Sequence, residues 1–177
     1  ALTDKDNSSL TFSWPYEAGE TIDVQIAATM AFELVIDSAT ISAPTHTFTG
    51  LNAATEYFVR TRKHCSQTEL SFWSDPVSAT TACSLYPLPF TEGFETMPVG
   101  NSTSEAPVCW DYLNANAGNP PYIFVDNTYA FNGGNSLYFT SGYYVYSYVV
   151  LPEFTAPINE LKLQLSAIAP GYYNTNK

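Results

Sequence analysis

The sequence has little charge, and positive charge is especially scarce. Lysine and arginine together number 6, against 17 aspartates and glutamates, so the net charge is -11 at pH 7. An acidic surface repels the phosphate backbone of nucleic acids, so we expect no nucleic-acid partner. Such a charge is typical of a soluble secreted protein, and it attracts cations.

Long hydrophobic runs are also missing. No run of about eighteen apolar residues occurs, so we expect no membrane-spanning helix. No long stretch repeats apolar residues at the 3.6-residue period of a helix. Hydrophobic residues nevertheless make up 45% of the 177 residues and aromatic ones 15%, which is a globular composition rich in strand formers. The sequence therefore predicts an all-β fold, with room for one large domain or two small ones.

Residues and motifs for catalysis are few. The chain has only two histidines, His46 and His64, and none of the motifs G-x-S-x-G, H-E-x-x-H or G-x-x-x-x-G-K-[ST]. Cys65 follows His64 directly, but a nucleophile and its base must meet in space, which adjacency in sequence does not establish. We therefore predict that the chain is not an enzyme.

Short alternating runs fill the first half of the chain. In the first of them Leu10, Phe12 and Trp14 share one face. The runs cover residues 10–14, 22–26, 32–36, 45–49, 56–63 and 77–81. Short strands at this spacing predict an antiparallel β-sandwich.

Two segments of this half resemble fibronectin type III domains. LNAATEY at residues 51–57 resembles the L-x-P-x-T-x-Y signature of that family, with Ala53 where proline is usual, and FWSDPVSATT at 72–81 resembles its last loop and strand. The resemblance implies that Tyr57 is the tyrosine-corner residue and Trp14 the core tryptophan of the second strand. It also implies an immunoglobulin-like fibronectin type III sandwich over residues 1–82, whose first strand is short or absent.

The cysteines are odd in number: Cys65, Cys83 and Cys109. Cys65 and Cys83 follow two antiparallel strands and so lie at opposite ends of the sandwich, roughly 20 Å apart at ~3.3 Å per residue. A disulfide needs Cα atoms within ~7 Å, which excludes this pair. A Cys83–Cys109 bond remains, with three free thiols as its rival. Cys65 is then unpaired or pairs outside this chain.

The second half of the chain differs from the first in composition. Prolines in LYPLPF stiffen its start, and loops rich in glycine, asparagine and serine separate its strands. The expected strands cover residues 122–125, 136–140, 143–152 and 160–168. In the last of these Leu161, Leu163 and Leu165 alternate with polar residues, which predicts a strand with one face on a core.

An ordered series of motifs in this half resembles MAM-type jelly rolls, and is most similar to bacterial cleaved-adhesin or choice-of-anchor J domains. The motifs are C, PFTEGFE, PVCW, GGNSLYF, YVVLPEF and INELKLQLSA, in that order. The resemblance implies a jelly-roll (galactose-binding-like, MAM-like) β-sandwich over residues 83–177, with its C-terminal part missing. It implies that Cys83 and Cys109 form the first disulfide. It also implies an open strand edge near residues 160–168, which would invite pairing with another chain.

The same resemblance implies a structural calcium ion, because related jelly rolls often hold one near their first strand. Glu95 belongs to the matched PFTEGFE motif and is the first candidate ligand, followed by Asp126 and Glu92. No EF-hand spacing occurs. The alternative is that these carboxylates are simply solvated loop residues.

The densest aromatic stretch is GYYVYSYVV. Tyr144, Tyr146 and Tyr148 share one face of a strand there, and a row of tyrosines can stack on sugar rings. The alternative, which we favour, is a strand packed on both sides.

Together these features predict a non-catalytic fragment of a larger protein that is secreted or on the outer cell surface. Its role would be adhesion or binding to a host or matrix protein or a glycan. One alternative is an accessory or spacer region of a secreted peptidase or glycoside hydrolase whose catalytic domain lies outside this chain. Another is the ectodomain of an animal cell-adhesion receptor, where the same two modules co-occur.

Overall fold

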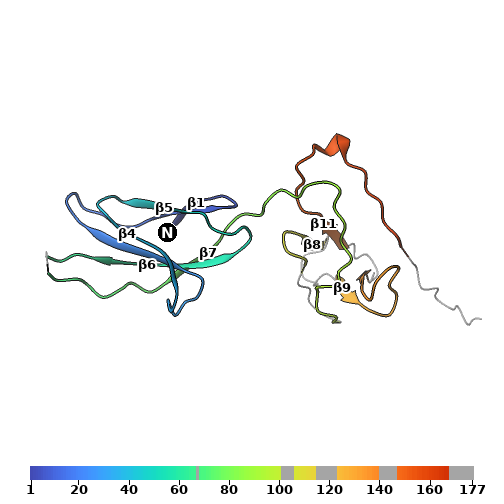
Figure 1. The fold of residues 1–177 in the computed structure, drawn as a ribbon, viewed down its shortest axis with the longest axis horizontal. Helices are drawn as coiled ribbons and strands as arrows, with labels where there is room; N and C mark the ends of the chain where they lie inside the picture. Colours follow the sequence, from blue (N-terminus) through green and yellow to red (C-terminus); the bar gives the residue numbers. More distant parts are fainter. Residues whose placement is uncertain (67, 101–105, 115–122, 140–146, 168–177) are drawn as a thin grey trace, which may run out of the picture. The chain divides into compact units, whose positions relative to one another are not determined.

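The computed structural model describes residues 1–66, 68–100, 106–114, 123–139 and 147–167 (Figure 1). Backbone contacts divide the chain into two compact units, Ala1–Ser84 and Leu85–Lys177. This division falls just after residue 82, where the sequence predicts a domain boundary; that boundary stays a prediction.

The first unit is built from two antiparallel sheets (Figure 1). The three-stranded sheet has the order β1 (Leu2–Lys5), β2 (Ser9–Ser13) and β5 (Thr45–Thr49). The four-stranded sheet has the order β4 (Val35–Ile41), β3 (Ile22–Ala27), β6 (Glu56–Lys63) and β7 (Val77–Thr80). The predicted all-β sandwich is confirmed, and the short first strand is present as β1.

Alternation along the strands produces the core between the sheets. In β3, Ile22, Val24 and Ile26 are buried while the residues between them are partly exposed, as the sequence predicts. Burying each such side chain contributes about 1.5–3 kcal/mol. The core cluster consists of Leu10, Phe12, Ile22, Val24, Ile26, Phe48, Leu51, Tyr57, Val59 and Ala79. Trp14 packs against this cluster and donates its Nε1–H to the carbonyl of Ala43 at 3.1 Å.

One strand of this unit differs from its prediction. A strand was expected at residues 32–36, ended by Asp37 and Ser38, but β4 begins at Val35 and carries both residues in its middle, paired with Ile26 and Gln25. Because β4 is an edge strand, both polar side chains stay exposed there at no desolvation cost. Phe32 lies in the preceding loop instead, with a positive φ of 54°.

The tyrosine corner predicted at Tyr57 is confirmed. The Tyr57 side chain is 3% exposed, and its hydroxyl oxygen accepts the backbone N–H of Asn52 at 2.9 Å. Thr81, also 3% exposed, donates its hydroxyl to the carbonyl of Asn52 at 2.6 Å and accepts the N–H of Thr55 at 3.0 Å. Two buried side chains, one in β6 and one just after β7 (Val77–Thr80), therefore hold the turn that leads into β6.

The second unit contains two short antiparallel pairs within its described residues. β9 (Ile123–Asp126) pairs with β10 (Ser136–Phe139), and β8 (Asp111–Asn114) pairs with β11 (Ser147–Val150). Ile123 and Val125 are buried. Five rings make contacts with centroid distances between 5.0 and 6.3 Å: Tyr86, Phe90, Phe94, Trp110 and Phe154. These strands agree with the predicted all-β class, and the jelly-roll topology stays a prediction.

The expected strand at residues 160–168 is not formed in its described part, residues 160–167. A short 3₁₀ turn, η1 (Ile158–Glu160), is followed by residues 161–167 without strand pairing, and Leu163 and Leu165 are 67% and 68% exposed. Alternating leucines do not make a strand without a neighbouring strand to bond, and the described residues provide none there. The prediction that these leucines face a core is wrong, and pairing with another chain stays a prediction.

Two cysteines are joined as expected. Cys83 and Cys109 are disulfide-bonded, while Cys65 is exposed and free. Closing a loop of this length contributes about 3–4 kcal/mol by restricting the unfolded chain. Among the described residues, no helix is long and apolar enough to cross a membrane.

We expect Tyr57→Phe to lower the free energy of unfolding by about 1–2 kcal/mol, because the N–H of Asn52 loses its acceptor in a partly buried turn. Urea denaturation measures this loss. Tyr16→Phe is the matched control, since the Tyr16 hydroxyl donates to the carbonyl of Ser42 at an exposed site. Equal losses in the two variants would contradict the role assigned to the tyrosine corner.

Candidate functional site

The outer face of the four-stranded sheet carries an ordered set of polar side chains. Alternate residues of a strand point to the same face, so residues opposite the core line up across β4, β3 and β6. The register aligns them in two rows, one of Ser38, Gln25 and Arg60, the other of Thr40, Asp23 and Arg62. Arg60 and Arg62 are the only arginines in the chain.

Aromatic rings cover both arginines. The Arg60 guanidinium carbon lies 4.1 Å from the ring centre of Phe32 and 4.5 Å from that of Trp73, and the Arg62 carbon lies 4.4 Å from Trp73. We call Phe32, Arg60, Trp73 and Arg62 the arginine–tryptophan stack. Each such contact contributes about 0.5–2 kcal/mol, depending on its solvent exposure.

The segment after β6 brings Trp73 to this position. His64 and Leu70 form an isolated antiparallel bridge, and the segment that follows runs beside β6. The N–H of Ser71 donates to the carbonyl of Lys63 at 2.9 Å, and the N–H of Ser74 donates to the carbonyl of Thr61 at 2.8 Å. Trp73 lies between these two anchored serines. Burial, and then the charge of Arg62, lower the pKa of Arg60.

Asp23 holds the second row together. Its carboxylate accepts three hydrogen bonds, from the Thr40 hydroxyl at 2.6 Å, from Arg62 Nε at 2.8 Å and from His64 Nε2 at 2.9 Å. Burial by itself raises the pKa of Asp23, but the three donors outweigh it and lower the pKa to about 2. Asp23 therefore stays ionised and fixes the orientation of Arg62.

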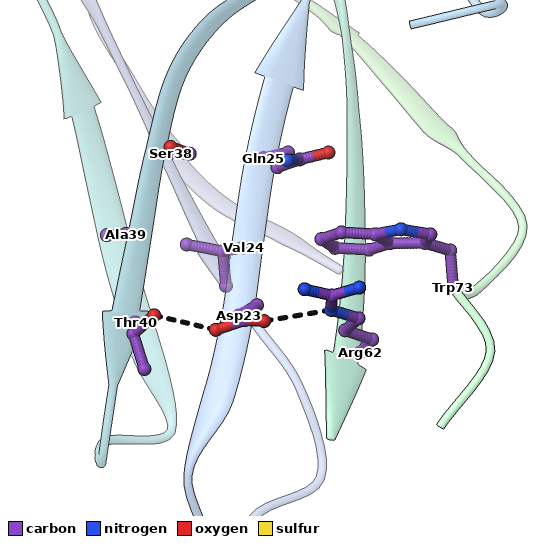
Figure 2. Close-up of a pocket in the computed structure, with 8 residues that line it drawn as sticks. All are labelled: Asp23, Val24, Gln25, Ser38, Ala39, Thr40, Arg62 and Trp73. Carbon is purple, nitrogen blue, oxygen red and sulfur yellow. Dashed lines mark hydrogen bonds and ion pairs between the residues drawn. The ribbon is translucent and has the colours of Figure 1, made fainter. Parts of the chain in front are cut away.

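A shallow hollow of about 240 Å³ lies beside the stack (Figure 2). Figure 2 shows the Trp73 ring edge-on, with the guanidinium of Arg62 beside it and Asp23 reaching from β3 toward both Arg62 and Thr40. The lining residues are Asp23, Val24, Gln25, Ser38, Ala39, Thr40, Arg62 and Trp73. Within the described part of the chain, the Ser38 hydroxyl, the Gln25 amide N–H groups and the terminal nitrogens of Arg62 make no hydrogen bond. The hollow thus offers both donors and acceptors to a ligand.

The first calcium candidate, Glu95, lies against the turn that joins β9 to β10. Its Oε1 accepts the N–H groups of Gly134 at 3.0 Å and Asn135 at 3.1 Å, and the Asn135 amide donates back to the carbonyl of Phe94 at 2.9 Å. Gly133 in this turn has φ of 119°, and a Cβ there would lie 2.1 Å from Glu95 Oε1. The Glu95 carboxylate therefore occupies the space that a side chain at position 133 would need.

The other calcium candidates also bond backbone close to themselves. Glu92 Oε1 accepts the N–H of Phe94 at 2.6 Å, and Asp126 Oδ1 accepts the N–H of Thr128 at 2.5 Å. In the described ranges no three His, Cys, Asp or Glu residues form a group that could hold a metal ion. All three carboxylates thus accept backbone N–H groups and stabilise turns. Calcium ligation by Glu95, Asp126 and Glu92 stays a prediction.

The tyrosine row can be followed only in part. Tyr148 lies in β11 opposite Leu113, and its side chain is 54% exposed. Tyr144 and Tyr146 lie outside the described residues. Sugar stacking by this row stays a prediction.

Sequence reasoning missed the arginine–tryptophan stack. Alternation along residues 56–63 puts Arg60 and Arg62 on the face opposite Tyr57 and Val59, but it does not connect them with Phe32 and Trp73. One signal in the sequence could have indicated this site. The only two arginines of an acidic chain lie two residues apart on one predicted strand, so they share one face of it.

Comparisons with known proteins add little. No family model matches the chain, and a search of curated proteins finds no match. One solved structure that it resembles is a fibronectin type III domain derived from a human protein, with 13% identity and a TM-score of 0.43 over 59% of this chain and 82% of that domain. The strand order and registers of the chain itself define its fold.

The low pKa of Asp23 predicts a pH dependence of stability. A carboxylate whose folded pKa of about 2 lies below the unfolded value of 3.8 stabilises the fold above pH 4 and loses this contribution as the pH falls toward 2. With allowance for solvent screening we expect a loss of about 1–2 kcal/mol over this range.

Urea denaturation between pH 5 and pH 2 measures the loss, with Asp23→Asn as the comparison. The variant should be less stable at pH 5 and should lose less stability on acidification. Parallel curves for the two proteins would show that Asp23 is not the group responsible.

We expect Gly133→Ala to lower the melting temperature of the second unit, because the positive φ is strained for alanine and because Glu95 must move and give up its hydrogen bonds with Gly134 and Asn135. Differential scanning calorimetry measures the effect. Gly100→Ala is the matched control, since nothing lies within 4 Å of a Cβ there. A melting temperature equal to that of the control would show that Glu95 does not occupy the turn as described.

Proposed function

We propose that the chain is a non-catalytic binding or adhesion module of a larger secreted or cell-surface protein. It would bind a host or matrix protein or a glycan through the outer face of its four-stranded sheet. The observation that carries this proposal is the arginine–tryptophan stack beside an open polar hollow on a rigid sheet.

The stack supports binding because it orders long side chains before any ligand arrives. A free arginine loses side-chain entropy when it binds, whereas Arg60 and Arg62 are already held by rings, by Gln25 and by Asp23. Tryptophan and arginine are also the residue types that contribute most at binding hot spots. A surface of this kind favours recognition.

The chemistry of the hollow supports binding over catalysis. Its eight lining residues include hydroxyls, an amide, a carboxylate and a guanidinium, but no cysteine, histidine or lysine. Ser38 and Thr40 therefore have no general base in the lining to activate them, and Asp23 is committed to three donors. These groups can form hydrogen bonds to a ligand without reacting with it.

The disulfide supports an extracellular location. Disulfide bonds form and persist in oxidising compartments, and Cys83 is bonded to Cys109. The acidic surface is consistent with a secreted protein. If the chain is instead an accessory region of a secreted peptidase or glycoside hydrolase, its ligand would be the polymer that the flanking catalytic domain degrades.

An array of matrix proteins and glycans tests the proposal. We expect the wild-type chain to bind at least one ligand, and Trp73→Ala to lose most of this binding because both arginines lose their support. Phe72→Ala is the matched control, since Phe72 is the adjacent aromatic residue, is 97% exposed and makes no contact with the stack. Absence of any binding by the wild-type chain, or full binding by Trp73→Ala, would count against the proposal.

A further inference from the structure

The outer face of the four-stranded sheet is locally positive on an acidic protein. The chain has a net charge of -11, yet both of its arginines lie on this face, where Arg62 pairs with the carboxylate of Asp23 and Arg60 bonds the neutral amide oxygen of Gln25. Lys63, the next basic residue of β6, is neutralised by its ion pair with Glu20. Among the described residues Arg60 therefore has no carboxylate within ion-pair distance, and its charge attracts an anion to this part of the face.

Arg62 presents a free edge suited to a carboxylate. Asp23 Oδ2 accepts only its Nε–H, at 2.8 Å, so the two terminal nitrogens remain available. A guanidinium edge binds a carboxylate through two parallel hydrogen bonds, and the stacked Trp73 ring and Asp23 fix the plane in which that edge lies. The anion expected from this geometry is a planar carboxylate.

The opposite side of the hollow suits hydroxyl groups. Ser38 and Thr40 of β4 present hydroxyls, and Gln25 of β3 presents amide N–H groups because its oxygen accepts from Arg60. Sugar hydroxyls both donate and accept, so they can satisfy such a mixed set. A single acidic side chain would bind Arg62 without reaching the Ser38 hydroxyl and the Gln25 amide, whereas one sugar ring carries a carboxylate and several hydroxyls together.

The size of the hollow limits the ligand to one ring. Pockets for drug-sized molecules measure about 300–1,000 Å³, and this one is smaller, at about 240 Å³. Because the hollow is shallow, the rest of a glycan could leave it on either side of a bound ring.

We propose that the hollow between β4 and Trp73 binds a carboxylate-bearing sugar residue of a glycan, with the carboxylate on Arg62 and ring hydroxyls on Ser38 and Gln25. This inference rests on the proposed binding function and narrows its ligand class. The recognition is non-covalent and needs no metal or cofactor.

Isothermal titration calorimetry with matched oligosaccharides tests the proposal. The probes are a hexasaccharide containing glucuronic acid and the same hexasaccharide with its carboxyl groups reduced to alcohols, and sialyllactose with lactose as its neutral counterpart. We expect at least one acidic probe to bind at least tenfold more tightly than its neutral counterpart, with an affinity that falls as salt is added.

Variants locate the site. Arg62→Lys should weaken binding about tenfold, because lysine keeps the positive charge but cannot form the two parallel hydrogen bonds of a bidentate guanidinium–carboxylate pair. Ser38→Ala should weaken it about three- to tenfold, and this exposed substitution leaves the stack and the core intact. Lys63→Ala is the control for a basic residue of the same strand outside the hollow, and its affinity should match that of the wild type.

Each of these results would overturn the proposal: equal affinity for acidic and neutral sugars, tight binding of a hexa-aspartate peptide with no binding of the sugars, or wild-type affinity in both Arg62→Lys and Ser38→Ala. Absence of binding by every oligosaccharide also overturns it. If a matrix protein nevertheless binds the same chain in the array, the general binding function stands and only the ligand class proposed here is wrong.

Discussion

The pairing of β3 with β6 decides both the core and the outer surface of the first unit. In its register Ile26 stands opposite Val59 on the buried face, while Gln25 and Asp23 stand opposite Arg60 and Arg62 on the other. A shift of one residue in either strand would move that strand's charged side chains into the core and its aliphatic ones into water. Packing of the hydrophobic core therefore also fixes the position of the polar site, because both consist of side chains on opposite faces of the same two strands.

Local sequence patterns were sufficient to predict strands and single contacts where the interaction involves residues close to the pattern itself. The runs 45–49 and 56–63 alternate regularly between residues that need burial and residues that tolerate water, and both strands have the predicted bounds. Tyr57 followed from a spaced signature whose purpose is a single hydrogen bond to Asn52. Two cysteines that precede matched motifs pointed to the bond that forms. In each case the deciding interaction is encoded within a few residues of the pattern.

The misjudged elements depended on neighbours that the local pattern does not describe. β4 could include Asp37 and Ser38 because it lies at a sheet edge, and edge position is a property of the whole sheet. Leu163 and Leu165 alternate as well as any strand residues, yet nothing among the described residues pairs with them. The arginine–tryptophan stack joins residues from a loop, a strand and the segment after a turn, so only the folded chain brings them together.

The position of Trp73 also has an optical consequence. Indole fluorescence responds to nearby charge, and this ring has guanidinium groups of two arginines within 4.5 Å. The chain's other tryptophans have different surroundings. Trp14 packs against the hydrophobic core of the first unit, and Trp110 contacts phenylalanine rings of the second. A ligand that moves Arg62 away from the indole changes the electric field at Trp73 and leaves the other two tryptophans unaffected. The intrinsic fluorescence of Trp73 therefore reports directly on the surface where recognition is proposed.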